Sequence, residues 1–390
     1  MVMSPSPPPP PQTQSQDQAL EPETFKDVSQ AQRFPCEQCG ADYRFDPQSH
    51  RMICAHCGHQ ADFDLDDPAQ GQIREIDFKS AQSATLSDDN MESIRTSSCP
   101  NCAAKVSFDT DIHAKECPFC ATPVVADTGT HKQHKPRAVL PFSIDERAAK
   151  AAMNEWLGSL WFAPNGLQDY ARKGRKLQGI YVPYWTFDAD TKTAYTGERG
   201  TVYYETRTVT RNGKTMTERV QRIRWSYKSG RVKRWFDDVL VLASKSLPPK
   251  HTEALEPWSL GDLKPYSSAY LSGFLSKSYV IYLDEGYDRA QEKMEAVIRR
   301  DVRFDIGGDR QRIHNMETDI SDVTFKHILL PVWMAAYKFR GESYRFVVNG
   351  QTGRVQGERP WLFWKIAFAV LLGLCVACAL GYAAAYYEQV

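Results

Sequence analysis

Eight of the ten cysteines fall into two quartets that share one internal spacing. Each quartet consists of two CxxC pairs separated by fourteen residues, and each position recurs 63 residues later in the chain. The candidate metal ligands are Cys36, Cys39, Cys54 and Cys57 in the first quartet, and Cys99, Cys102, Cys117 and Cys120 in the second. Two such turns joined by a hairpin place four thiolates in a tetrahedron, so the spacing predicts two zinc ribbons.

Four thiolates fill the coordination shell of Zn²⁺ and leave no position for water or substrate, so we expect two structural zinc ions. His56 and His59 are alternative ligands in the first ribbon, but the second ribbon has no counterpart to either. Redox-active pairs and disulfides are the other interpretations. The N-terminal sequence MVMSPSPPPPPQTQSQ lacks the apolar stretch of a secretory signal, which favours a reducing compartment and therefore zinc.

The rest of the chain divides by composition. Residues 1–33 are rich in Pro, Gln and Ser and are expected to form a disordered tail. The predicted order after that tail is zinc ribbon 34–60, acidic linker 61–96, zinc ribbon 97–123, linker 124–136, α+β domain 137–357 and transmembrane anchor 361–387. The predicted fold class is α+β, with helices packed on a mainly antiparallel sheet.

The C-terminal segment predicts a membrane helix. Residues 366–387 carry no charge over 22 positions, which at about 1.5 Å per residue spans a hydrocarbon core of about 30 Å. Arg354, Arg359 and Lys365 precede this segment, so the positive-inside rule places the N-terminal bulk in the cytoplasm. We therefore expect a tail-anchored, single-pass protein of the cytoplasmic (inner) membrane. Cys375 and Cys378 lie within the segment and are interpreted as small packing residues rather than ligands.

The middle region predicts helices and hairpins. A capping box at 143–146 opens a helix expected to end near residue 162, and a charged helix is expected at 284–302. A long hairpin is expected to turn at Asn212-Gly213. The segments IYVPYW, from 180, and ILLPVW, from 328, share a proline and a tryptophan, which makes a duplicated helix-plus-sheet unit a hypothesis.

The hairpin carries a local excess of positive charge, although 48 basic residues balance 48 acidic ones overall. Residues 205–236 contain ten Lys or Arg and two Glu. The candidate contacts for an anionic ligand are Arg222, Arg224, Trp225, Lys233, Arg234 and Trp235. Basic residues interleaved with aromatic ones suit single-stranded nucleic acid or anionic lipid headgroups, and a solvated hairpin without a ligand is the third interpretation.

Catalytic motifs are not found. The segment RNGKT lacks the first glycine of a phosphate-binding loop, because Thr208 occupies that place. The chain contains no HExxH or GxSxG motif. We therefore expect a protein that is not an enzyme.

The paired ribbons, the strand YVPYWTFD, the hairpin RFVVNGQTGRVQGERPW and the hydrophobic end resemble a family of bacterial membrane proteins with TFIIB-type zinc ribbons. Members of that family are often labelled primosomal protein N′ (replication factor Y)-like. The resemblance covers residues 34–387 and implies a membrane scaffold that acts with SPFH-type or phage-shock-type membrane proteins. The helicase motifs that the label would require are absent from the sequence.

These features together predict a membrane-tethered adaptor that uses two zinc ribbons to recruit a protein partner, because two linked modules raise avidity. The alternative is a nucleic-acid-binding protein held at the membrane by its anchor, without a motor of its own.

Overall fold

The computed structural model describes residues 34–62, 73–82, 91–98, 105–107, 114–116, 123–125, 130–160, 177–211, 214–245, 247, 249–339, 342–360 and 362–389. The predicted disordered tail lies outside these residues. So do all four cysteines of the second quartet.

The N-terminal strands form three small antiparallel groups. The first contains β1 (Tyr43–Asp46), β2 (Arg51–Cys54) and β3 (Gln60–Ala61). In the second, β5 (Met91–Ser98) pairs with β6 (Lys105–Ser107) and β9 (Thr130–His134). In the third, β7 (Ala114–Glu116) pairs with β8 (Pro123–Val125).

The main sheet is dominated by three long antiparallel strands, β11 (Gln178–Arg211), β12 (Lys214–Leu242) and β15 (Arg310–Phe339). Its shorter strands are β4 (Ile76–Asp77), β10 (Ala138–Val139), β13 (Lys264–Pro265), β14 (Leu275–Ser276), β16 (Glu342–Asn349) and β17 (Val355–Gly357). The helices are α1 (Phe78–Gln82), α2 (Glu146–Ser159), α4 (Pro249–Glu253), α5 (Leu283–Ile306) and α6 (Phe363–Gln389), with short 3₁₀ turns η3 (Leu260–Asp262) and η4 (Ser268–Leu271). This combination confirms the α+β class.

The predicted hairpin is confirmed, because β11 ends at Arg211 and β12 begins at Lys214. The segment that contains IYVPYW forms part of the one long strand β11. The capping residue of α2 is Asp145, whose carboxylate accepts a hydrogen bond from the Ala148 N–H at 2.7 Å. Helix α2 ends at Ser159, three residues short of the expected end.

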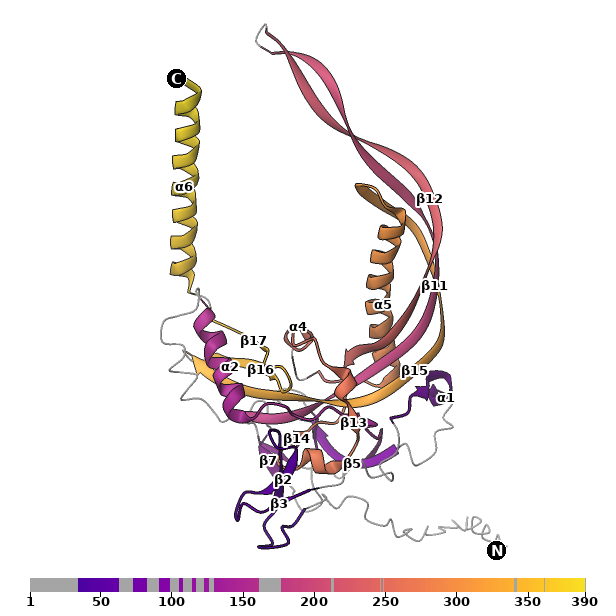
Figure 1. Ribbon diagram of the computed structural model, residues 1–390, viewed down its shortest axis with the longest axis vertical. Helices are drawn as coiled ribbons and strands as arrows, with labels where there is room; N and C mark the ends of the chain where they lie inside the picture. Colours follow the sequence, from indigo (N-terminus) through magenta and orange to yellow (C-terminus); the bar gives the residue numbers. More distant parts are fainter. Residues whose placement is uncertain are drawn as a thin grey trace, which may run out of the picture.

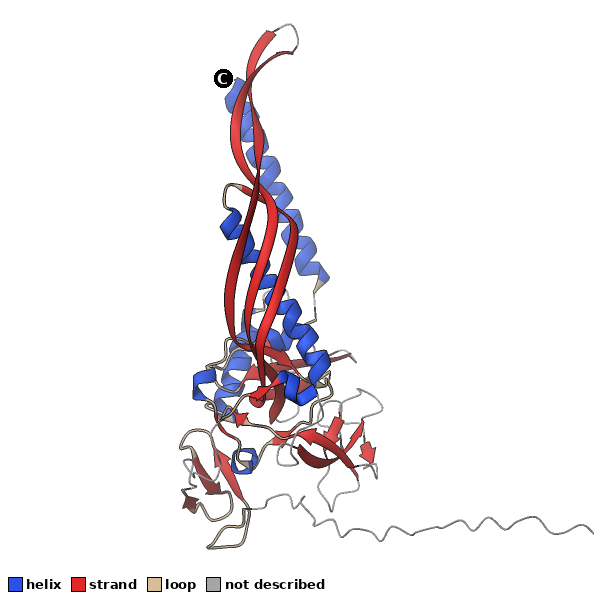
Figure 2. Ribbon diagram, turned by 90° about the vertical axis from the view of Figure 1, so that its right-hand side faces the viewer, coloured by secondary structure: helices blue, strands red, loops and turns tan. Residues whose placement is uncertain are grey.

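Helix α5 lies along the inner side of the curved strands β11, β12 and β15 (Figure 1). After Leu283 its buried residues recur every four positions, as a helix with one apolar face requires. They are Gly286, Ala290, Met294, Ile298, Val302 and Ile306. The hairpin end of β11 and β12 extends past both α5 and β15 as a two-stranded distal arm, which Figure 2 shows from the side.

The strands β11 and β15 pair about a central point where Val182 lies opposite Leu330. Pro183 and Trp185 follow that point on β11, and Pro331 and Trp333 follow it on β15. The short strand β10 pairs in parallel with β15, and β14 pairs in parallel with β11. The two halves of the domain therefore share one arrangement of elements around this point.

Parts of the two predicted linkers belong to the folded domain, which corrects their assignment. Strand β4 pairs with β15, and the adjoining Phe78 is buried against Phe187, with ring centroids 6.3 Å apart. Strand β9 pairs with β5, and the N–H of His134 donates to the Tyr279 hydroxyl at 2.9 Å. The acidic and polar composition of these segments does not indicate such contacts, because only a few of their residues make them.

Helix α6 contains the one segment of the described chain that is long and apolar enough to cross a membrane, Phe363–Gly381. None of that segment is buried against the rest of the protein. In Figure 1, α6 leaves the domain on the side toward which the two-stranded arm also extends, while β1, β2 and β3 lie at the opposite end.

Candidate metal centre

The first cysteine quartet lies on two turns of the same shape. The Gly40 N–H donates to the Cys36 carbonyl at 2.8 Å, and the Gly58 N–H donates to the Cys54 carbonyl at 2.9 Å. Both glycines have a φ of +73°, a conformation that glycine adopts without steric strain. Each CxxC pair therefore forms a tight turn with its two sulfur atoms on one side.

The two turns bring all four sulfur atoms within 4.8 Å of one another. Cys36 Sγ lies 3.6 Å from Cys57 Sγ, and Cys39 Sγ lies 3.5 Å from Cys54 Sγ. Four sulfur atoms at about 2.3 Å from a tetrahedral Zn²⁺ would be about 3.8 Å apart. The observed spacing therefore fits a zinc ion, and the residues that would hold it are the four predicted cysteines.

The two turns change the pKa values of the thiols that they hold. Burial raises the pKa of Cys36, but the backbone N–H donors of Gln38 and Cys39 outweigh it, and the pKa falls to about 6. The backbone around Cys57 also lowers the pKa of Cys54. Four thiolates at this distance repel one another, and a bound dication removes that repulsion and favours the deprotonated ligands.

Neither histidine near the first quartet is part of the four-sulfur cluster. His59 Nδ1 instead lies 2.6 Å from the Tyr43 hydroxyl, and this hydrogen bond joins the second turn to β1. His56 is exposed on the outer surface of the same turn. The interpretation of a four-cysteine site, with no histidine ligand, agrees with this geometry.

The first ribbon is docked on the main domain. The Phe45 N–H donates to the Ser272 carbonyl at 3.1 Å, and the Ser272 hydroxyl donates to the Tyr43 carbonyl at 2.6 Å. The Phe45 ring meets the Tyr270 ring at 5.2 Å. Cys36 and Cys54 consequently belong to the same buried cluster as residues of α2 and β16. This contact was not predicted, because the sequence analysis treated the ribbon as an isolated module.

The second predicted zinc ribbon cannot be compared in the same way, since Cys99, Cys102, Cys117 and Cys120 lie outside the described residues. The second zinc site stays a prediction from the sequence repeat.

The six candidate anion contacts are divided between the two faces of β12, because successive strand residues point to opposite faces. Arg234 donates to Asp301 of α5, with Nη2 at 2.9 Å from Oδ1, so its charge is already paired. Arg222 lies 3.4 Å from Glu205, and Arg224 lies over the Tyr203 ring. The other face carries Trp225, Lys233 and Trp235. These six residues therefore do not form one site.

A buried lysine is a feature that the sequence analysis missed. Lys326 Nζ lies 2.8 Å from Asp238 Oδ1 and 2.9 Å from Glu75 Oε1. Burial raises the pKa of the nearby Asp188 to about 6. The hydrogen bond that its carboxylate accepts from the Asp238 N–H acts in the opposite direction. The cluster lies where the pairing of β11 and β12 shifts register between Phe187 and Ala189. It holds β4 on the sheet at that irregularity.

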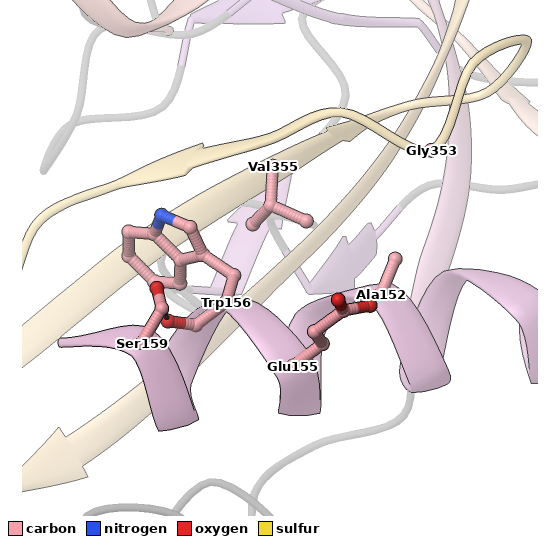
Figure 3. A pocket seen from close by; sticks show the side chains of 6 residues that line it. All are labelled: Ala152, Glu155, Trp156, Ser159, Gly353 and Val355. Carbon is pink, nitrogen blue, oxygen red and sulfur yellow. Dashed lines mark hydrogen bonds between the residues drawn. The ribbon is translucent and has the colours of Figure 1, made fainter.

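A shallow depression separates α2 from the β16–β17 hairpin (Figure 3). The residues that line it are Ala152, Glu155, Trp156, Ser159, Gly353 and Val355. Glu155 is the one ionisable side chain among these lining residues.

The chain is similar to an uncharacterized protein, YdjG, of Bacillus subtilis (strain 168). The two are 26% identical over 336 residues, which cover 86% of this chain and 92% of the relative. No model of a protein family matches the chain, and no solved structure matches it.

Proposed function

We propose that this protein is a tail-anchored adaptor that presents zinc ribbons to a protein partner at the cytoplasmic face of the inner membrane. The observation that carries the proposal is the docking of the first four-cysteine cluster on the domain whose last strands lead into α6. A docked ribbon is held at a fixed position on the domain that carries the proposed anchor, which a freely linked ribbon is not. Fixed presentation suits recruitment of a partner.

The outer surface of the first ribbon is the proposed contact. Cys36 and Cys54 are buried, whereas Glu37, Gln38 and His56 on the same turns are exposed. The zinc ions have structural roles in this proposal, because four thiolates complete the coordination of each ion. The resemblance to the TFIIB-type zinc-ribbon membrane proteins suggests SPFH-type or phage-shock-type proteins as partners.

Membrane anchoring is tested by deletion. Removal of residues 361–390 should move the chain from the membrane fraction to the soluble fraction, because it removes the proposed span. Continued sedimentation with membranes after carbonate washing would contradict anchoring by α6 alone.

Recruitment is tested by substitutions that leave the zinc ligands in place. Gln38→Ala with His56→Ala should abolish capture of the partner from detergent-solubilised membranes, while zinc content stays at the wild-type level. The matched control is Gln48→Ala, which lies on the side of the ribbon that meets Asp145 of the domain. A partner that binds both variants equally, or capture of nucleic acid instead, would contradict the adaptor.

A further inference from the structure

The distal arm is the part of the hairpin that has no third strand. The last pairing between β11 and β15 joins Gly200 to Arg310, and α5 ends at Ile306. Beyond this level only β11 and β12 remain, over residues 201–211 and 214–224. Two-stranded ribbons of this kind are marginally stable in water alone, so a surface that supports this ribbon is expected.

The distal arm has a net positive charge, which lies mainly on the face of Arg222 and Arg224, while Arg219 lies on the other face. Its sequence contains six Lys or Arg and two Glu. The Arg219 guanidinium lies 5.2 Å from the centre of the Tyr204 ring on one face, and the Arg224 guanidinium lies 5.3 Å from the Tyr203 ring on the other. Because each face has such a pair, either face can meet an anionic surface.

Apolar side chains accompany this charge. Tyr204 is 60% exposed, and Ile223 is 39% exposed. Phe304, in the last turn of α5 below the arm, is 90% exposed, and Arg300 and Arg303 are exposed beside it. Isolated aromatic and aliphatic side chains among cationic ones are typical of surfaces that lie at the headgroup level of a membrane.

The direction of the arm indicates which surface it meets. The arm and the C-terminal end of α5 extend on the same side of the domain as α6 (Figures 1 and 2). A membrane that holds α6 therefore lies on the side of the arm. Single-stranded nucleic acid could stack on the tyrosines, but it explains neither this placement nor the exposed Ile223 and Phe304.

We propose that the distal arm and the last turn of α5 form a second membrane contact, which binds the headgroups of anionic phospholipids. The arm stays outside the hydrocarbon, since a charged Lys or Arg side chain is energetically costly there. In Figure 1 the arm runs alongside α6 and reaches past its C-terminal end, so contact at the headgroups requires α6 to tilt away from the arm. The apolar segment of α6 is not packed against the rest of the protein, which leaves room for this tilt. The proposal rests on membrane anchoring by α6.

The contact is tested with the full chain in nanodiscs. A photo-crosslinking amino acid replaces Tyr204 in one variant and Tyr282 in the control, because Tyr282 is 56% exposed but lies at the other end of α5. Discs of phosphatidylcholine alone are compared with discs that also contain phosphatidylglycerol. We expect lipid adducts at position 204 to increase at least about fivefold with the anionic lipid, to fall at high salt, and not to change at position 282.

Charge reversal provides the second comparison. Arg219→Glu, Arg222→Glu and Arg224→Glu together should reduce the adducts at position 204 about tenfold or more, since each charge near an anionic surface contributes about 1 kcal/mol. Lys79→Glu, Lys250→Glu and Lys264→Glu change the net charge equally and should leave the adducts unchanged. Free inorganic phosphate at millimolar concentration should not compete, whereas competition would indicate a simple anion site.

Each outcome decides between the proposals. If the chain is not retained in discs, anchoring by α6 fails. If it is retained but position 204 gives no lipid adducts, or equal adducts in both disc types, the second membrane contact fails while the anchor stands. Preferential crosslinking of position 204 to added single-stranded RNA in the presence of anionic discs would overturn the lipid assignment.

Discussion

The two tryptophans at the centre of the domain have matching hydrogen bonds but different coverings. Trp185 Nε1 donates to the Ile281 carbonyl at 2.9 Å, just before α5. Trp333 Nε1 donates to the Ile144 carbonyl at 3.1 Å, just before α2. Trp185 of β11 thus holds the start of α5, and Trp333 of β15 holds the start of α2.

The backbone around both tryptophans repeats the same pattern. Leu140 N–H donates to the Leu329 carbonyl, and the equivalent bond joins Lys277 N–H to the Tyr181 carbonyl. Gly350 N–H donates to the Pro331 carbonyl, as Ala243 N–H does to the Pro183 carbonyl. Ile144 N–H donates to the Gly350 carbonyl, as Ile281 N–H does to the Ala243 carbonyl. Equivalent aromatic contacts accompany them: Phe142 meets Trp333 at 5.0 Å, and Tyr279 meets Trp185 at 4.9 Å. The two parts of the domain therefore repeat one arrangement, and the duplicated helix-plus-sheet unit stays a hypothesis.

The halves differ in what covers the central core. The core around Trp185 is covered by the 24 residues of α5. The core around Trp333 is covered by the 14 residues of α2 together with Phe45 and other residues of the first zinc ribbon. The ribbon therefore covers area that the shorter helix leaves open. The long helix of the other half supports the extended arm instead.

Loss of the first zinc site should have the largest effect and should be confined to one core. Cys36→Ser with Cys54→Ser removes two ligands of a site worth about 10–16 kcal/mol in binding free energy, so residues 34–62 should unfold. Amide hydrogen exchange should increase there, at Ser268–Leu271 and in α2, and not in α5. Zinc content should fall by one ion per chain.

The control for the zinc prediction is Cys375→Ser with Cys378→Ser, which should change neither zinc content nor exchange. Equal deprotection of α5 and α2 in the ligand variant would show that the two cores are not separable.

Truncation of the tryptophans should come next in magnitude. Trp185→Ala and Trp333→Ala should each lower the free energy of unfolding by about 3–5 kcal/mol, measured by urea titration in detergent. Loss of the first zinc should reduce the further effect of Trp333→Ala, because the two share a core, and should leave the effect of Trp185→Ala unchanged. If zinc loss and each tryptophan substitution have additive effects on the free energy of unfolding, then Trp333 and the first ribbon do not share a core.

Local patterns predicted much of this structure. The CxxC spacing identified the first cluster by residue, and alternation around Asn212-Gly213 identified the long hairpin. Long-range docking was not predictable in the same way, because Phe45 and Phe78 look like ordinary apolar residues of short segments. Their partners, Tyr270 and Phe187, are more than a hundred residues away in the chain.

The division of the candidate anion contacts between two faces could have been predicted. Arg222, Arg224 and Arg234 are even-numbered on one strand, whereas Trp225, Lys233 and Trp235 are odd-numbered, and alternate strand residues face opposite ways. Which face α5 covers depended on packing of its apolar stripe, which the hairpin sequence does not encode. The pairing of Arg234 with Asp301 follows from that packing.

The core around Trp185 should respond to acid through a buried histidine. His327 lies six residues before Trp333, at the position that Gly179 occupies before Trp185, and its ring packs on Trp185. Burial lowers the pKa of His327 to about 4. The contact of its Nδ1 with the His134 carbonyl acts in the opposite direction. The unfolded chain binds a proton below about pH 6.5 and the folded chain does not, so stability falls as the pH decreases from 6.5 toward 4.

At pH 5 this histidine should reduce the free energy of unfolding by about 2 kcal/mol relative to pH 7. His327→Asn keeps a donor for the His134 carbonyl and removes the titration, so it should lower stability at pH 7 and flatten the change between pH 7 and 5. His50→Asn, on the exposed turn of the first ribbon, should not flatten it. An unchanged slope in His327→Asn would exclude this residue as the cause.

The smallest expected effect concerns one matched pair of helix positions. Gly286 and Ala149 each lie five residues after the carbonyl that accepts a tryptophan N–H, and both are buried. A Cβ at Gly286 would lie 2.8 Å from Trp185 Cδ1, which is closer than carbon atoms approach, and the Trp185 ring is fully buried. Gly286→Ala should gain about 1 kcal/mol in helix propensity and lose about 1–3 kcal/mol to overpacking, for a net loss of up to about 2 kcal/mol. Ala149→Gly has no such conflict and should cost only the propensity, about 1 kcal/mol. If Gly286→Ala instead stabilises the chain in urea titration, then Trp185 can shift, and the close approach of α5 to β11 is not what distinguishes the two cores.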